Sequence, residues 1–122
     1  MIKITFCLRR KFGMSLEEFQ EYWLNNHAPL VKKHAAALHI KRYVQTHASE
    51  TPLNAALRDT RGGPEPYDGV AEIWFDSVED MMSAMDDDAG REAGQALLDD
   101  EKKFIDLEHS PLWLNEERVI IG

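Results

Sequence analysis

The residue best suited to chemistry is His27, which lies between the aromatic pair Tyr22-Trp23 and Pro29. Trp23 comes four residues earlier, which in a helix places both side chains on one face. Pro29 opposes smooth continuation of the helix, so the sequence predicts that His27 lies at a helix end. Because histidine titrates near neutral pH, an imidazole held in one pose there is our first candidate for general acid–base catalysis.

His27 also has a purely structural interpretation. An imidazole at a helix C-terminus can hydrogen-bond the last carbonyls and favour the negative end of the helix dipole. The catalytic and structural roles are compatible. His34 lies seven residues further on, beside two lysines that indicate a solvated face. A metal held by His27 and His34 would need another ligand, and HxH and HExxH patterns are absent, so we expect no metal site.

Tyr43 is the second catalytic candidate. It shares one face of a predicted strand with Lys41, Gln45 and His47. Its hydroxyl could donate a hydrogen bond to a developing oxyanion. The alternative is an ordinary sheet residue with a buried ring and a bonded hydroxyl. His47, near the end of the same strand, is a candidate for the ligand pocket.

Glu72 is the one acidic residue of an otherwise apolar strand, so its charge should be paired or should reach solvent. Arg9 and Arg42 are the partners that the sequence offers across the sheet. A buried ion pair and a polarised cavity wall both remain open. Aromatic walls would suit a planar apolar ligand, although the tryptophans could instead pack or seal an interface. The residues assigned to the ligand pocket are Trp23, His47, Glu72, Trp74 and Arg9.

The first half of the chain predicts two strands separated by helices. Residues 2–9 alternate apolar and polar side chains, as a strand does. Ser15 and Glu18 form a capping-box pattern at the start of a helix. A second helical segment over 30–38 follows Pro29, and residues 39–47 alternate again.

The second half begins with a long loop over residues 50–66, with a helical turn predicted at 52–58. Loops of this length in small domains are often functional. Residues 67–75 form a third strand, apolar on both faces apart from its acid. Ser77 then caps a helix with a core-facing apolar stripe, consisting of Val78, Met81, Met82 and Met85. A helix over 89–105, with a possible break at Gly94, and a strand over 112–121 complete the pattern.

The element order is β-α-β-β-α-β, the ferredoxin-like arrangement of the α+β class with an antiparallel four-stranded sheet. Two helices cover one face of such a sheet, and no helix remains for the other. Because the last two strands carry apolar residues on both faces, we expect a second copy of the sheet to cover it. The sequence therefore predicts a homodimer with facing sheets, built from one domain over residues 1–122.

Composition narrows the function. The net charge of −8 disfavours nucleic acid as a partner. No apolar run reaches membrane-spanning length and the start lacks a signal-peptide pattern, so we expect a cytoplasmic protein without a membrane partner. The acidic clusters 86–88 and 99–101 are interpreted as solvated helix ends. Nucleotide-binding and serine-nucleophile motifs are absent, so no cofactor is expected.

Several segments together carry a family resemblance: Ser15-Leu16-Glu17-Glu18-Phe19, Tyr22-Trp23 to His27-Ala28-Pro29-Leu30, Arg42-Tyr43-Val44-Gln45 and residues 68–75, with the opening strand and Arg9-Arg10. The chain resembles the EthD family of the dimeric α+β barrel superfamily. The family is named for ethyl tert-butyl ether degradation operons, where EthD looks like an accessory protein. Similar proteins are lactone isomerases, or cyclases and decarboxylases of aromatic polyketides. Their cofactor-free sites use a His, often with a Tyr, between sheet and helices, and that His maps onto His27.

Two functions follow as expectations. In the first, each subunit binds a small apolar, aromatic or lactone-like molecule, and His27 moves a proton with help from Tyr43 in an isomerisation, cyclisation or decarboxylation. In the second, the protein is a non-catalytic accessory module of a catabolic pathway that sequesters a metabolite. The fold alone does not decide between them.

Overall fold

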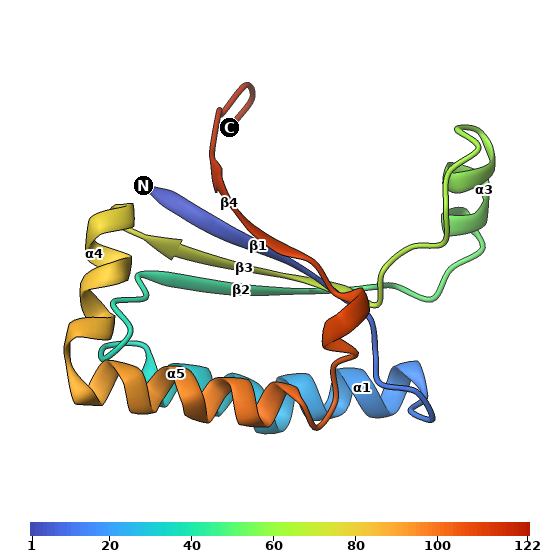
Figure 1. Cartoon of the computed structure of the whole chain (residues 1–122). Helices are drawn as coiled ribbons and strands as arrows, with labels where there is room; N and C mark the ends of the chain where they lie inside the picture. Colours follow the sequence, from blue (N-terminus) through green and yellow to red (C-terminus); the bar gives the residue numbers. More distant parts are fainter.

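The computed structural model describes residues 1–122 as a four-stranded antiparallel sheet with its main helices against one face (Figure 1). The strands lie in the order β2-β3-β1-β4, which is the predicted ferredoxin-like arrangement. The strands are β1 (Ile2–Leu8), β2 (Arg42–His47), β3 (Gly69–Phe75) and β4 (Leu112–Glu116). The α-helices are α1 (Leu16–Tyr22), α2 (Ala28–His34), α3 (Leu53–Asp59), α4 (Val78–Ser83) and α5 (Asp88–Glu101). Shorter turns are η1 (Trp23–His27), η2 (Ala84–Asp86) and η3 (Leu107–His109).

The first helix begins at the predicted capping box. The Ser15 hydroxyl accepts a hydrogen bond from the Glu18 amide, and the Glu18 carboxylate accepts one from the Ser15 amide, both at 3.0 Å. These two bonds satisfy amides that have no partner inside the helix.

The predicted helix end at His27 is wrong, because the chain stays helical from α1 through η1 into α2. The segment η1 is a π-helical turn, in which the Ala28 amide donates to the Trp23 carbonyl five residues back. The extra residue lets the helix continue, and Pro29 then falls in the first turn of α2, where its missing N–H costs nothing. His27 is therefore buried inside a continuous helical run.

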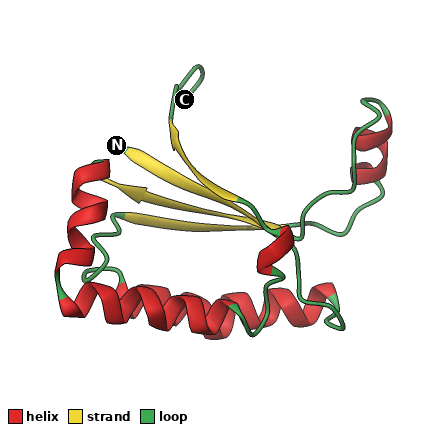
Figure 2. Cartoon of the chain, in the orientation of Figure 1, coloured by secondary structure: helices red, strands yellow, loops and turns green.

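The core lies between the sheet and the layer formed by α1, η1 and α5 (Figure 2). Its largest fully buried side chains are Leu8 from β1, Phe19 and Trp23 from the first helical run, and Phe104, which follows α5. Gly69 is required at the start of β3, because a Cβ there would lie 2.4 Å from the Trp23 ring. The backbone of β3 thus approaches the indole closely.

The opposite face of the sheet carries no helix. Strand alternation places Lys3, Glu72 and Trp74 there. Glu72 pairs with Lys3, so the predicted partners Arg9 and Arg42 were wrong. Lys3 and Arg42 both lie opposite Trp74, on the two sides of β3, and it is the Lys3 ammonium that reaches Glu72.

Trp74 is buried on this face under two cations. The Lys3 ammonium lies 5.1 Å and the Arg42 guanidinium 4.7 Å from its ring. Its indole N–H donates to Glu117 at 2.7 Å. This cluster ties the segment after β4 to the sheet.

The last strand is shorter than predicted. Glu116 pairs with Ile2, the first residue of β1, so beyond it the sheet offers no further partner. Val119, Ile120 and Ile121 are consequently exposed. Similarly, β2 begins at Arg42 rather than at residue 39, because His39 has a positive φ of 62° that turns the chain.

The predicted core stripe on α4 was wrong. Met82 and Met85 are 62% and 43% exposed, and Val78 is also exposed. Helix α4 is short and stands at the end of the sheet instead of lying across it (Figure 1). By contrast, α5 runs unbroken through Gly94. The predicted turn near residues 52–58 is confirmed as α3, which projects from the body.

Candidate functional site

A small cavity lies between the sheet and the helices. It holds about 40 Å³ of internal space. Three of its lining residues can exchange protons: His27 from η1, Tyr43 from β2 and Glu101 from α5. The rest of the lining is apolar: Phe6, Leu8, Trp23, Val31, Ile40, Ala71, Ile73, Leu97 and Ile105. Polar groups in such surroundings interact strongly with one another and with any bound molecule.

His27 is held by a carboxylate on the neighbouring helix. Its Nδ1 lies 2.8 Å from Asp100 Oδ2, and the two side chains are 6% and 11% exposed. Asp100 Oδ1 also accepts a hydrogen bond of 2.6 Å from the Tyr22 hydroxyl. Because an ionised carboxylate only accepts, this contact places the imidazole proton on Nδ1. The lone pair is then on Nε2, which forms no hydrogen bond within the protein.

The electrostatics favour a neutral imidazole beside an ionised carboxylate. Burial lowers the pKa of His27, although Asp100 opposes this effect. Burial also acts to raise the pKa of Asp100, but hydrogen bonds from Tyr22 and His27 outweigh it, and the net pKa is lowered. A neutral His with its proton fixed on one nitrogen can act as a base through the other.

Tyr43 presents its hydroxyl proton without an acceptor. Its oxygen accepts a hydrogen bond of 2.9 Å from the Gln45 amide, which also donates to the Trp23 carbonyl at 3.0 Å. The Gln45 carbonyl in turn lies 2.8 Å from His47 Nε2. Burial raises the pKa of Tyr43. The phenol therefore stays protonated and can donate to an oxygen of a ligand.

Glu101 completes the polar lining. Its pKa is raised to about 7 by burial and by the charge of Asp100. The sequence interpretation of the cluster 99–101 as a solvated helix end was therefore wrong for two of its members, since Asp100 is buried and Glu101 lines the cavity.

A signal for both acids was present in the sequence. Ala93, Leu97, Asp100 and Phe104 are spaced as one helical stripe, and Ala93 and Phe104 are fully buried. Glu101 follows Leu97 by four residues, on the adjacent edge of that stripe. Reading the stripe rather than the acidic run would have placed both carboxyls toward the core.

The structure brings some of the predicted site residues together and separates others. His27, Tyr43 and Trp23 line the cavity. His47 lies next to it, with its ring 4.4 Å from that of Trp23. Glu72 and Trp74 were wrongly assigned to this pocket, because alternation along β3 turns both to the opposite face.

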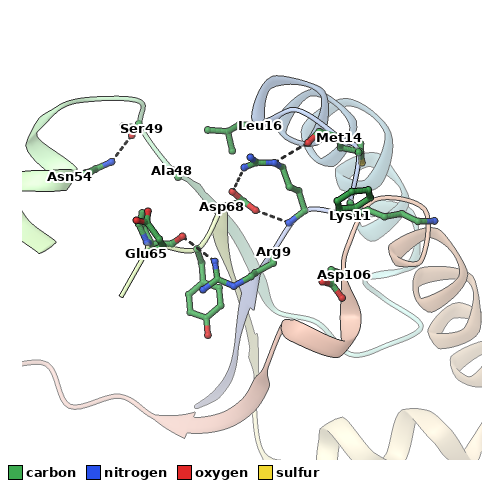
Figure 3. Close-up of a pocket in the computed structure, with 15 residues that line it drawn as sticks. Arg9, Lys11, Met14, Leu16, Ala48, Ser49, Asn54, Glu65, Asp68 and Asp106 are labelled. Atoms are coloured by element: carbon green, nitrogen blue, oxygen red, sulfur yellow. Dashed lines mark hydrogen bonds and ion pairs between the residues drawn. The ribbon is translucent and has the colours of Figure 1, made fainter. Parts of the chain in front are cut away.

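Arg9 was also wrongly assigned to the pocket, because it lies past the end of β1 in a different hollow (Figure 3). This open cleft, of about 630 Å³, is the larger of the two. The Arg9 guanidinium stacks on Tyr67 at 4.2 Å and donates to the Pro66 carbonyl. Arg10 binds Asp68 through both its guanidinium and its backbone amide, at 2.6 and 2.7 Å.

Two shallow grooves adjoin the cavity at Tyr43. One, of about 320 Å³, runs between α2 and β2 and shares Val31, Ile40 and Tyr43 with the cavity lining. The other, of about 350 Å³, is bordered by Tyr43, Gln45 and His47. These grooves connect the edge strand β2 with the enclosed polar groups.

The side chains show no metal-binding arrangement, since no three His, Cys, Asp or Glu residues are grouped to hold an ion. No helix in the structure is long and apolar enough to cross a membrane. The candidate site is thus a set of proton-exchanging side chains in an apolar cavity.

The fold and this cavity define a ferredoxin-like α+β protein with polar groups enclosed between sheet and helices. A model of the EthD domain matches residues 11–108, which is most of the chain, and the protein therefore belongs to the EthD family. A protein of Claviceps purpurea named as a decarboxylase is 28% identical over 119 residues, which cover 93% of this chain and 82% of that protein.

Solved structures share the fold. An EthD-family protein from Bacillus halodurans superposes with a TM-score of 0.63 at 24% identity, covering 97% of this chain and 99% of the other. A dimeric ferredoxin-like protein of unknown function from Bacteroides fragilis gives a TM-score of 0.58 at 12% identity, covering 95% of each chain. At these identities the likeness establishes the architecture alone.

Proposed function

We propose that this protein binds a small apolar or aromatic molecule at the sheet–helix cavity and catalyses a cofactor-free proton transfer on it. One observation carries the proposal: His27 Nδ1 is bonded to Asp100, and Nε2 remains unpaired in a cavity lined by Tyr43. His27 is the base, Asp100 fixes its tautomer, and Tyr43 donates to the oxygen on which charge develops. A base placed in this way contributes about 10²–10⁴-fold to a proton-transfer step.

Within that class, decarboxylation of an aromatic acid is the reaction we favour over isomerisation and cyclisation. Support comes from the relative named as a decarboxylase, which aligns over almost the whole of this chain. Loss of carbon dioxide from a hydroxylated ring needs proton transfer and oxyanion stabilisation but no redox cofactor. The cavity of about 40 Å³ is too small for a ring, since ligand sites usually measure about 300–1,000 Å³. A ring must therefore enter from the grooves at Tyr43 and widen the cavity.

The test is a panel of hydroxylated benzoic and naphthoic acids, with product detected by chromatography and carbon dioxide release. The wild-type protein should convert at least one member without added metal or cofactor. His27→Gln should then reduce kcat/KM by about 10²-fold or more. The matched control is His109→Gln, since His109 is 65% exposed and pairs with Asp106 away from the cavity. Equal rates for wild type and His27→Gln would refute the proposal.

The alternative function is a non-catalytic accessory protein that holds a metabolite. A ligand held in the grooves at Tyr43 would not need to widen the cavity of about 40 Å³, which favours this role, because a binding module needs no access of the ligand to Nε2. Titration of the same aromatic acids, followed by tryptophan fluorescence, distinguishes the two functions. Binding without product, and unaffected by His27→Gln, would support the accessory role.

We also propose that two copies pair through their helix-free sheet faces. Trp113 is 48% exposed, and the apolar tail residues Val119, Ile120 and Ile121 have no cover within the chain. Apolar surface of this kind marks an association site. Sedimentation should give twice the 14.0 kDa chain mass. Trp113→Glu should shift the protein toward monomer, whereas Leu53→Glu on the projecting α3 should not.

A further inference from the structure

Glu101 lines the same cavity as His27 and Tyr43, and proton transfer by His27 with help from Tyr43 leaves it without a role. Its carboxyl group accepts no hydrogen bond and forms no ion pair, and nothing but burial and the neighbouring Asp100 perturbs it. An unpartnered carboxylate in apolar surroundings is costly, and such a group reduces the cost by taking up a proton. Asp100, one residue earlier, is instead held ionised by two hydrogen-bond donors.

The groups that face Glu101 come from three elements. His27 from η1 and Tyr43 from β2 line the cavity with it, and Asp100 precedes it on α5. No lysine or arginine lines the cavity. Lys103 lies 3.7 Å from Asp100 and is itself 66% exposed. No positive charge therefore stabilises an ionised Glu101 from within the cavity.

We propose that Glu101 is the general acid that delivers a proton to the substrate carbon, while His27 is the base. This inference rests on the proposed function and deepens it, because it assigns acid and base to different residues of one cavity. A neutral imidazole that can accept a proton, and a carboxyl that still carries one near pH 7, are what a reaction with proton transfer at two atoms requires. The substrate class that uses both is an aromatic carboxylate with a hydroxyl group on the adjacent ring carbon.

With that substrate, the reaction begins at the phenol and ends with the release of carbon dioxide. His27 Nε2 accepts the phenolic proton, which raises electron density in the ring. Glu101 then gives its proton to the ring carbon that bears the carboxylate, and a C–H bond forms there. The bond from that carbon to the carboxylate breaks, its electron pair returns to the ring, and carbon dioxide leaves. His27 returns the phenolic proton, and Glu101 takes a new proton from water.

The first experiment measures whether Glu101 carries a proton. In protein labelled with [5-13C]glutamate, one carboxyl signal should titrate near pH 7 and should be missing from Glu101→Gln. The matched control is Glu92→Gln, an exposed residue of the same helix, which should keep that signal. A Glu101 carboxyl that is ionised throughout pH 6–8 would overturn the proposal.

The second experiment measures the role in the reaction, with the hydroxybenzoic or naphthoic acid that the wild type decarboxylates. Glu101→Gln should lower kcat by about 10²-fold or more and remove the alkaline limb of the pH–rate profile, since only the protonated acid donates. Glu92→Gln should leave both unchanged. If Glu101→Gln left the rate and the pH profile unaltered while His27→Gln lost activity, the role of Glu101 would be refuted and the proposed function would stand. Failure of the wild type on the whole panel would refute the proposed function and this inference with it.

Discussion

The open cleft and the sheet–helix cavity differ in whether their polar side chains are paired, and the smaller hollow is the one with unpaired groups. The cleft beside Arg9 and Arg10 has about 630 Å³, and the sheet–helix cavity about 40 Å³. In the cleft, Arg10 is paired with Asp68, and the Arg9 guanidinium is stacked and bonded. In the cavity, His27 Nε2, the Tyr43 hydroxyl proton and the Glu101 carboxyl have no protein partner.

Unpaired polar groups are therefore a better guide to the site of chemistry than the volume of a hollow. A charge already bound by a neighbour must lose that bond before it can bind a ligand. A group left unpaired in an apolar cavity is destabilising in the folded state, and a ligand that pairs with it recovers that cost. The cavity therefore holds unpaired groups that a ligand can bind. The hydrogen bonds and ion pair in the cleft instead fix the strand ends and the long loop.

Substitution of the two aspartates, Asp100 at the cavity and Asp68 at the cleft, should differ most in its effect on activity. In Asp100→Asn, the amide can donate to His27 Nδ1, which would move the imidazole proton to Nε2 and abolish its basicity. We expect activity to fall by about 10²-fold or more while the fold persists. The tautomer is read from 15N chemical shifts of the imidazole.

Asp68→Asn is the matched control, because Asp68 makes equally short bonds to Arg10 in the cleft. Its activity should stay within a factor of about two of wild type, since an exposed pair contributes little. Activity loss in Asp68→Asn equal to that in Asp100→Asn would place the chemistry in the cleft instead.

The next effect compares two tyrosines. Tyr43→Phe removes the hydroxyl proton that faces the cavity, and loss of one oxyanion donor costs about 10²–10³ in kcat in other enzymes. We expect a fall of at least about 10-fold with little change in KM, because the bond strengthens in the transition state. Tyr67→Phe, under the Arg9 guanidinium in the cleft, should leave kcat unchanged. A change confined to KM would make Tyr43 a binding residue.

Local patterns in the sequence were sufficient to predict the sheet and its order of elements. The capping box at Ser15, the alternation in β1 and the Ser77 cap all act within a few residues, and each is present as expected. Strand ends depend on partners far along the chain, so the early end of β4 could not be predicted from that strand alone. The exposed methionines of α4 show the same limit, since periodicity indicates a stripe without showing what covers it.

The site was predictable only in part, for a similar reason. His27 and Tyr43 were identified by residue type and by resemblance, and the structure places both at one cavity. Asp100 is 73 residues from His27 in the sequence, and its bond to the imidazole depends on how α5 packs on η1. The acidic run around it suggested solvent exposure, because three adjacent acids usually lie on a wet surface. Tertiary packing outweighed that local tendency.

A third prediction uses stability, which requires no substrate. The pKa of Glu101 is raised from 4.5 to about 7, so the folded state holds a proton that the unfolded state loses between these values. Ionisation of Glu101 therefore lowers the free energy of unfolding as pH rises from about 4.5 to 7. Above about pH 7 this destabilisation stays constant. Glu101→Gln should remove that cost and gain about 1–3 kcal/mol over wild type at pH 8, with little gain at pH 4.5.

Urea unfolding at several pH values measures the effect of Glu101. The lowered pKa of His27 has the opposite pH dependence. As pH falls below 6.5, the unfolded state takes up a proton before the folded state does, and the free energy of unfolding decreases. The difference between Glu101→Gln and wild type cancels the His27 contribution, because both proteins contain it. An equal difference at pH 4.5 and pH 8 would mean that Glu101 is not desolvated.

The smallest expected effect lies in the cleft. Arg10 is 40% and Asp68 15% exposed in their side chains, and the Arg10 guanidinium also donates to the Met14 carbonyl at 3.0 Å. Because solvent screens such a pair, a double-mutant cycle with Arg10→Gln and Asp68→Asn should give a coupling free energy of about 0.2–1 kcal/mol. Activity should not change, since neither side chain of this pair lines the cavity. A coupling free energy above about 3 kcal/mol is typical of a buried pair and would show that the cleft is closed to water. The two hollows would then differ in burial as well as in the pairing of their polar groups.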